Sequence, residues 1–371
     1  MTSHERARRH LEALAMAPRP AGGDAETRAR RYCAGVLARA GMQVSEEPFG
    51  YSEFAGRYAT PAAGALAIVG LLGAAALGSS GRGAAAGAVL TLSLVVLATC
   101  GTWLARRGVV GLGIMRRHGT NLAATRGTPA VWLVAHLDSK SQPIPILVRA
   151  GGIVATSVVW IAALGLTVAQ VLGWDVERWW PWLAVAGVIA AAPIAASFVG
   201  ARSPGALDDA SGVATVLLSA EESAGIPLGV LLTSAEELGL AGARAWVQGV
   251  EPGVAINCDG VDDSGKLAAM YSGSRPHRLL ESFAKAAAAV EVPSRSHRVL
   301  PGVLVDAVAL ADRGWEVVTL SRGSMRTLHR IHTRDDSLDH LRGDGIPVTA
   351  AVVISMVRDV AVRDGERGLR G

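Results

Sequence analysis

Cysteine, lysine and charged residues in general are scarce in this sequence. The chain of 371 residues contains three scattered cysteines, Cys33, Cys100 and Cys258. An odd number at such spacings predicts neither a disulfide framework nor a paired thiolate site, which excludes the small disulfide-rich secreted proteins. Charged residues make up 18% of the chain and hydrophobic residues 50%. This composition is too apolar for an ordinary soluble enzyme.

Stretches in which basic and aromatic residues alternate are also missing. The net charge is +4, and the basic residues are almost all arginine. We therefore expect no nucleic-acid partner. The beginning of the chain, MTSHERARRHLEALAM, is charged and predicted to be helical, and it lacks the apolar core of a signal peptide. We expect a reducing, cytoplasmic setting for the soluble part.

Hydrophobicity is concentrated in four long runs that contain no charged residue. These runs cover residues 58–81, 83–105, 150–174 and 179–201. About 20 mainly apolar residues span the hydrocarbon core of a bilayer as a helix. Helices in a soluble core rarely stay uncharged over that length, and here four do so. We therefore predict an integral membrane protein with four transmembrane helices, arranged as two hairpins.

Small residues and tryptophans follow a pattern within these runs. Gly83 with Gly87, and Gly151 with Ala155, have the small-xxx-small spacing by which helices in lipid pack closely. Four tryptophans gather around the second predicted turn, as in an interfacial aromatic belt: Trp174, Trp179, Trp180 and Trp182.

The basic residues that flank the runs predict the orientation of the chain. The side shared by both termini and the middle segment carries Arg57, Arg106, Arg107, Arg116, Arg117, Lys140, Arg149 and Arg202. The two turns carry only Arg82 and Arg178. Because cytoplasmic loops are enriched in Lys and Arg, we expect both termini and the soluble domain in the cytoplasm, with the turns outside the cell membrane.

The residues outside the two hairpins are typical of one α/β domain. Helices are predicted at residues 24–39, 212–222, 276–290, 304–313 and 346–363. Strands are predicted at 42–49, 121–125, 131–136, 228–235, 253–258, 266–272 and 316–321, with those at 121–125 and 131–136 paired with each other. The domain then comprises 1–56, 107–148 and 203–371, and the hairpins comprise 57–106 and 149–202.

Polar side chains follow the predicted strands at the points where the strands end. His136 and Asp138 come directly after one buried strand, and Glu236 and Glu237 after another. Asp259 follows a third strand in the same way. We expect these side chains to reach a cleft at the carboxyl edge of the sheet.

Two loops add further groups of the metal-ligand type. The loop GALDDASGVA (205–214) carries Asp208 and Asp209, and His332 lies in a loop before the last helix. Alone, a His-x-Asp sequence is usually structural, and a Glu pair after a strand often serves a helix N-terminus. Together, two histidines and several carboxylates at successive strand ends predict a metal centre.

These motifs, taken in order, resemble the co-catalytic di-zinc aminopeptidases of metallopeptidase family twenty-eight. The resemblance rests on His136-x-Asp138, Asp208-Asp209-Ala-Ser-Gly, Glu236-Glu237, Asp259 and His332. It covers roughly 119–361 apart from the second hairpin, with a weaker match in the N-terminal helix and strand. It implies a mixed, mostly parallel sheet of about eight strands between helices, and hydrolysis of N-terminal residues from peptides.

The resemblance also implies a ligand set for two zinc ions. Asp208 would bridge the two ions, which lie about 3.5–4 Å apart in two-metal sites. His136 and Asp259 would complete one position. Glu237 and His332 would complete the other, and both positions have the nitrogen and oxygen ligands that suit zinc.

The remaining residues of the motifs receive supporting roles from the resemblance. Asp138 would accept the other ring N–H of His136 and fix its tautomer. Glu236 would be the general base, taking a proton from water and passing it to the leaving amine. Asp209 would shape its loop rather than bind metal.

Two features depart from the family's pattern. His136 and Asp208 are 72 positions apart, because the second hairpin is inserted between them. The apolar run therefore ends where the aspartate loop begins, and we expect the cleft near the membrane surface. No tyrosine stands in the stretch before His332 where an oxyanion donor is expected. Arg322 and His329 are candidates for that role.

Three functions remain open on the sequence alone. The first is a membrane-embedded zinc aminopeptidase that acts on peptides. The second is an acyl transferase like the glutaminyl cyclases, which usually keep one zinc, so the presence of His136 and Asp259 counts against it. The third is a receptor or scaffold without activity, which the intact Glu236 argues against. The oligomeric state stays open, a homo-oligomer included.

Overall fold

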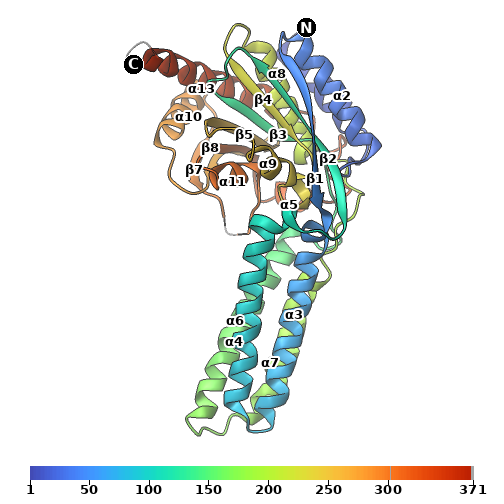
Figure 1. Cartoon of the computed structure of the whole chain (residues 1–371), viewed down its shortest axis with the longest axis vertical. Helices are drawn as coiled ribbons and strands as arrows, with labels where there is room; N and C mark the ends of the chain where they lie inside the picture. Colours follow the sequence, from blue (N-terminus) through green and yellow to red (C-terminus); the bar gives the residue numbers. More distant parts are fainter. Residues whose placement is uncertain (301, 369–371) are drawn as a thin grey trace. The chain divides into compact units, whose positions relative to one another are not determined.

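The computed structural model describes residues 1–300 and 302–368, with side chains as far as residue 362 (Figure 1). The predicted last segment, 203–371, therefore includes a few residues outside this part. The chain forms two compact units. Unit 1 comprises Met1–Tyr51, Arg116–Ser141 and Ala201–Gly371, and unit 2 comprises Ser52–Met115 and Gln142–Gly200.

Within the described residues, unit 1 is built on a mixed sheet of eight strands in the order β1-β2-β4-β3-β5-β8-β6-β7. The strands are β1 (Gln43–Ser52), β2 (Arg116–Arg126), β3 (Trp132–His136), β4 (Leu228–Thr233), β5 (Val254–Val261), β6 (Lys266–Tyr271), β7 (Ser294–Arg298) and β8 (Glu316–Gly323). The central strands β4, β3, β5 and β8 are parallel neighbours. Strand β2 is antiparallel to β4, and β6 is antiparallel to β8. The predicted α/β class with a mixed sheet is confirmed.

Helices cover both faces of this sheet. One face carries α1 (Ser3–Leu14), α2 (Asp24–Arg39), α8 (Ser211–Glu222), α10 (His277–Ala289) and α13 (Gly345–Gly368). The other carries α9 (Ala241–Trp246) and α11 (Asp306–Ala311), and α12 (Thr327–Arg330) lies in the segment before α13. Successive strand residues alternate between the two cores: Leu133 packs in the first and Val134 in the second. This alternation explains why the central strands are apolar throughout.

The predicted pairing of the strands at 121–125 and 131–136 with each other is wrong. Strand β4 lies between them, antiparallel to β2 and parallel to β3. The reason is the continuous apolar run of β4, whose residues are all buried, so that it takes a central place in the sheet. Strand β7 at the edge, with mostly exposed residues, was not predicted because it lacks that apolar signal.

Unit 2 is a bundle of four long helices (Figure 1). These are α3 (Glu53–Ser79), α4 (Gly83–Trp103), α6 (Ile146–Val171) and α7 (Trp180–Ala195), with the short α5 (Val109–Gly111) after α4. Alanines, two leucines and two tryptophans form the core of the bundle, whereas many large apolar side chains are exposed, among them Ile161 at 71% and Ile189 at 70%.

Close packing in the bundle occurs where small residues meet a partner helix. A methyl group at Gly87 would lie 2.6 Å from Thr167 Cγ2, so this predicted small-residue position does allow α4 and α6 to approach. The other predicted position is shifted by one residue. Gly151 faces open space, whereas a methyl group at Gly152 would lie 2.9 Å from the Ala190 carbonyl oxygen.

The tryptophans of the predicted belt are not equivalent. Trp174, Trp179 and Trp182 are at least half exposed, but Trp180 is only 1% exposed. Its indole Nε1 donates to Gln170 Oε1 at 3.0 Å within the bundle. Trp180 therefore belongs to the core of unit 2 and not to a belt.

Among the described residues, four helices are long and apolar enough to cross a membrane. Three of them are α3, α4 with its extension to Gly111, and α6, which lie in the predicted hairpins. The fourth is Gly345–Val362, in α13, and not the predicted α7, which has 16 residues. Half of the α13 segment is buried, because it packs against α8 and α10 on the sheet. Its apolar residues thus have a partner within unit 1.

Candidate metal centre

The predicted ligands come from the carboxyl ends of three adjacent parallel strands and from two loops. His136 ends β3, and Glu236 and Glu237 lie on a turn just after β4. Asp259 lies near the end of β5, where the pairing with β8 is irregular between Cys258 and Val261. Because these strands run parallel, their carboxyl ends meet at one edge of the sheet.

The carboxylate of Asp208 lies between two imidazole rings. Its Oδ1 is 3.0 Å from His136 Nε2, and its Oδ2 is 3.1 Å from His332 Nε2. Each oxygen thus faces a different histidine. The loop Ala206–Ala210 that carries Asp208 has a cis peptide bond to Asp209 and leads directly into α8. This is the arrangement expected of a carboxylate shared by two metal positions.

Two groups of side chains are spaced closely enough to bind metal ions. Asp208, Glu237 and His332 offer ligand atoms within 4.8 Å of one another, and so do His136, Asp209 and Asp259. The second group contains Asp209 where the resemblance implies Asp208. However, Asp209 Oδ1 already accepts from the backbone N–H groups of Gly212 and Gly260, both at 3.0 Å.

The other oxygen of Asp209 accepts from the backbone N–H of His136 at 3.3 Å. Its carboxylate therefore connects its own loop to β3 and β5. Gly212 is essential to this contact, since a methyl group there would lie 2.2 Å from Asp209 Oδ1. These contacts occupy the Asp209 carboxylate with backbone N–H groups, whereas that of Asp208 faces the two histidines.

Glu236 and Glu237 point to different parts of the site. Glu236 Oε2 is 4.0 Å from His136 Nε2, whereas Glu237 Oε1 is 3.2 Å from His332 Nε2. The cause is a tight turn rather than the alternation of a strand, because β4 ends at Thr233 and Ala235 is left-handed with φ 58°. A non-glycine residue in this region is uncommon and often marks a functional site.

Asp138 acts on the two glutamates more directly than on the histidine ring. Its carboxylate accepts from the backbone N–H groups of Glu236 at 3.0 Å and Glu237 at 3.2 Å. The ring atom His136 Nδ1 lies 3.0 Å from the Asp138 carbonyl oxygen and 3.7 Å from its carboxylate. The partner that fixes the tautomer is thus the main chain of Asp138, while its side chain orients the turn.

Three residues at the site were not singled out from the sequence. The Lys140 ammonium is 2.6 Å from Glu237 Oε2. Asp336 accepts from the backbone N–H groups of Leu207 and Asp208 at 2.5 and 3.2 Å, and so joins the His332 segment to the aspartate loop. Lys140 could have been identified as a site residue from the sequence, since it follows the His-x-Asp motif in a chain with only three lysines.

The third residue, Arg19, is only 2% exposed. Its guanidinium donates to the carbonyl oxygens of Leu14, Leu137, Pro204 and Gly205 at 2.6–3.0 Å. These carbonyls belong to α1, to the segment after β3 and to the aspartate loop. Arg19 therefore ties the N-terminal segment to both loops that supply ligands.

Charged neighbours keep part of the carboxylate cluster ionised. Burial opposes ionisation of Asp208, but hydrogen bonds from His136 and His332 outweigh it and hold the pKa of Asp208 well below its ordinary value. Burial acts in the same direction on Glu237. The Lys140 ammonium and then His332 overcome it and lower the pKa of Glu237 to about 2.

The surroundings of other carboxyl groups in the cluster oppose their ionisation. Burial, aided by repulsion from Glu237, raises the pKa of Glu236 well above its ordinary value. Burial and the charge of Asp208 raise the pKa of Asp259 to about 7. Carboxyl groups crowded in this way are expected to bind cations, because a bound metal ion reverses such shifts.

The residues present fit a zinc centre. Among the described residues, no hydrogen-bond donor is aimed at the buried Glu237 Oε1, although it faces His332. Buried acceptors normally have a partner, and an atom left free in this way is expected of a metal ligand. Imidazole nitrogens with carboxylate oxygens are the ligand set that zinc takes in catalytic sites.

The two oxyanion candidates lie elsewhere. Arg322 Nε is 3.4 Å from the Gly265 carbonyl oxygen, and a methyl group at Gly345 would meet its guanidinium, so it serves the loop before α13. His329 is exposed on α12. Neither side chain has a contact with the ligand cluster among the described residues, and these two candidates are not supported.

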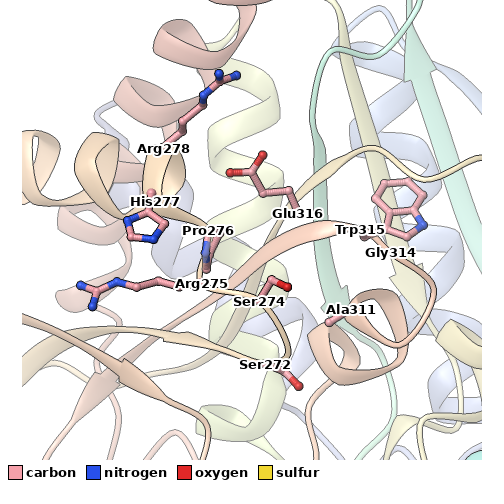
Figure 2. Close-up of a pocket in the computed structure, with 10 residues that line it drawn as sticks. All are labelled: Ser272, Ser274, Arg275, Pro276, His277, Arg278, Ala311, Gly314, Trp315 and Glu316. Atoms are coloured by element: carbon pink, nitrogen blue, oxygen red, sulfur yellow. The ribbon is translucent and has the colours of Figure 1, made fainter.

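A cavity of about 410 Å³ lies away from this cluster (Figure 2). It is lined by the loop before α10, including Arg275, by His277 at the start of α10 and by Glu316 at the start of β8. Glu316 pairs with Val254 at the start of β5, whereas Asp259 is near the end of that strand. The cavity is thus at the opposite edge of the sheet, and none of the predicted ligands lines it.

The fold and this cluster define an α/β domain with metal-ligand residues at the carboxyl edge of a mixed sheet. The chain belongs to peptidase family M28, whose family model matches residues 120–357. The resemblance drawn from the motifs is therefore confirmed at the level of the family. A search of curated proteins finds no match.

Solved structures of the same fold include both peptidases and cyclases. An aminopeptidase from Aneurinibacillus sp. strain AM-1 has a TM-score of 0.59 at 14% identity, covering 96% of this chain and 94% of that one. A zinc aminopeptidase from Bacillus subtilis has a TM-score of 0.56 at 15% identity, with 96% and 94% covered. A glutaminyl cyclase from Porphyromonas gingivalis has a TM-score of 0.55 at 14% identity, with 96% of both chains covered. At these identities the similarity concerns the fold.

Proposed function

We propose that this protein is a membrane-embedded zinc aminopeptidase with two zinc ions per chain. The observation that carries the proposal is the Asp208 carboxylate, which presents one oxygen to His136 and the other to His332. Asp259 would complete the His136 position, and Glu237 the His332 position. Bound there, zinc would activate water and polarise the scissile carbonyl group.

Glu236 is the general base in this proposal. It lies beside the ligand cluster, 4.0 Å from His136 Nε2, and its side chain is 5% exposed. Asp138 fixes the turn that carries it through the backbone N–H of Glu236. A carboxylate held in this way can take the proton of the attacking water and deliver it to the departing amine.

The test compares the two adjacent glutamates. Glu236→Gln keeps the volume of the side chain but removes the proton acceptor, so turnover of aminoacyl amides should fall by about 10²–10⁴-fold. Metal content should stay near that of the wild type, and KM should change little, because the lost interaction belongs to the transition state. Glu237→Gln, the matched control, should lose metal, and added zinc should partly restore its activity.

Two outcomes would redirect the assignment. If Glu236→Gln loses metal and Glu237→Gln keeps it, the roles of the two residues are reversed. If neither change affects turnover of any aminoacyl substrate, the peptidase proposal fails. Peptides with N-terminal glutamine belong in the same panel. Their cyclisation without release of N-terminal residues would favour the glutaminyl-cyclase function, and an inactive wild type would favour a receptor or scaffold.

The membrane part of the proposal rests on the surface of unit 2. Side chains such as Leu92, Val158 and Ile161 are at least 60% exposed on helices that are long and apolar. In water, exposed apolar areas of this extent are rare on single-chain proteins, whereas lipid is their natural solvent. The flanking arginines support a cytoplasmic location of unit 1 under the positive-inside rule.

Cysteine labelling tests this orientation. Ser80 and Asp175 are exposed at the two turns, and Ser294 on β7 is an exposed control in unit 1. The background needs only Cys100→Ala, since the other two cysteines are buried. An impermeant maleimide added outside intact cells should label Ser80→Cys and Asp175→Cys but not Ser294→Cys. The reverse pattern would contradict the orientation.

A further inference from the structure

Lys140 is a cation inside a cluster of carboxylates. Its side chain is 17% exposed, and its Nζ donates to Glu237 Oε2 at 2.6 Å. Glu237, Glu236 and Asp208 are the acidic groups that act on it most strongly. A buried ammonium beside acidic groups is stabilised by their charge. Lys140 therefore belongs to the site and is not a surface lysine.

The ammonium makes the two oxygens of Glu237 unequal. Oε2 is occupied by Lys140 at 2.6 Å. Oε1 faces His332 Nε2 at 3.2 Å and, among the described residues, has no hydrogen-bond partner. Carboxylates can bind a metal ion through one oxygen or through both. Here one oxygen is already taken by a charged donor, and only Oε1 is free.

We propose that Lys140 is a positioning residue that restricts Glu237 to binding metal through a single oxygen. This inference rests on the proposed function, because it assigns a metal position to Asp208, Glu237 and His332. A catalytic zinc site keeps an open coordination position for water or substrate. By withholding Oε2, Lys140 keeps that position open on the His332 side of the site.

The proposal predicts opposite changes in metal binding and in turnover. Without the ammonium, both oxygens of Glu237 are free to bind the same ion, and one nearby positive charge that repels the ion is gone. Zinc should therefore bind more tightly. The added ligand atom fills the open position, so turnover should fall. If Lys140 had only a structural role, its removal would weaken zinc binding and turnover together. Tighter zinc binding with slower turnover therefore distinguishes the positioning role from a structural one.

Lys140→Met is the test variant, since methionine has a similar length and no charge. Zinc affinity is measured by competition with a chelator in the full-length protein in detergent, and turnover with aminoacyl amides. We expect the weaker-bound zinc to be held about 10-fold more tightly and kcat to fall about 10–100-fold, the range seen when groups that orient metal ligands are changed. When cobalt replaces zinc, the visible absorption of the metal should be weaker in Lys140→Met than in the wild type, because the metal ion binds a further ligand atom.

Two further variants control the experiment. Lys140→Arg keeps a charged donor and should bind zinc as the wild type does. Lys285→Met removes a lysine from an exposed ion pair with Glu281, at 3.0 Å on α10, and should change neither affinity nor kcat. Thermal unfolding of the metal-free proteins checks folding, and Lys140→Gln replaces Lys140→Met if the latter is unfolded.

Each result decides between the explanations. Weaker zinc binding in Lys140→Met, or unchanged kcat, would overturn the role of Lys140. The role of Lys140 would also be overturned if Lys140→Arg bound zinc as tightly as Lys140→Met does. A wild-type protein that binds no zinc would instead refute the proposed function, and this outcome is distinct from the others.

Discussion

The two units of this protein both have an apolar core, but unit 1 also buries charged side chains, whereas unit 2 exposes large apolar ones. In unit 1, Asp138 and Asp209 are 1% and 0% exposed, and Arg19 is 2% exposed. In unit 2, the apolar Ile161 and Ile189 are at least 70% exposed. Unit 1 therefore depends on hydrogen bonds to buried polar groups in addition to its apolar core, and unit 2 on close contact between small residues. The difference is the one expected if unit 2 lies in lipid, as proposed above, and it predicts that each unit should fail by its own mechanism.

The largest effect on stability is expected from Arg19→Met in unit 1. The change leaves four carbonyl oxygens without their donors, and buried acceptors without partners are costly. Unfolding of unit 1 should become easier by about 3–5 kcal/mol, measured by chemical denaturation. Arg8→Met is the control, because Arg8 pairs with Glu12 on the surface, where an ion pair contributes little to stability. Equal effects of the two changes would contradict this account of unit 1.

Gly78→Ala tests the corresponding claim for unit 2. A methyl group at Gly78 would lie 2.1 Å from Trp180 Cε2, and Trp180 is buried in the bundle. Overpacking of this kind should destabilise the bundle by about 3 kcal/mol, seen as a lower Tm in detergent. Gly101→Ala on α4 is the control, since a methyl group there meets no atom within 4 Å. A bundle that tolerates both changes equally is not held by close packing.

A smaller effect, on pH dependence, is expected from Glu26 in unit 1. Burial, with the charge of Asp138 adding to it, raises the pKa of Glu26 to about 7, from 4.5. Between these values the folded protein binds more protons than the unfolded one, so stability should decrease as pH rises from about 4.5 to 7. Glu26→Gln should reduce the loss of stability between pH 5 and 8 by about 2 kcal/mol.

Denaturation at several pH values measures this change. Glu46→Gln is the control, because Glu46 forms an exposed ion pair with Arg30 at 3.1 Å, which contributes little. A pH dependence that is the same in Glu26→Gln and in the wild type would show that the buried carboxyl group is not responsible.

The sequence predicted those parts of the site that depend on local patterns. His136, Glu236 and Glu237 were located because they follow apolar strands, and strand ends determine where side chains meet. The order of β2, β4 and β3 was predicted wrongly, since nothing in the sequence of a buried strand specifies which strands lie beside it. The shorter helix α7 was predicted as a span because its apolar run continues beyond the helix.

Residues that act over long sequence separations were missed for a physical reason. Arg19 is 118 positions from Leu137 and 186 from Gly205, its hydrogen-bond partners. Lys140 is 97 positions from Glu237. The contacts of Arg19 leave no trace in a single sequence, because hydrogen bonds to carbonyl oxygens place no demand on the type of the partner residue. The contact of Lys140 is an ion pair, but the sequence does not specify which of the many acidic residues is its partner. Only the folded chain brings these groups together.

The metal content of the protein tests the central claim most directly. Protein purified in detergent with excess zinc, then freed of unbound metal, should contain two zinc ions per chain by elemental analysis. Asp259→Ala should retain about one, since it belongs to one position, and Asp208→Ala should lose both, because its carboxylate faces both histidines. One ion or none in the wild type, or two ions retained in Asp208→Ala, would contradict a centre built around a shared Asp208.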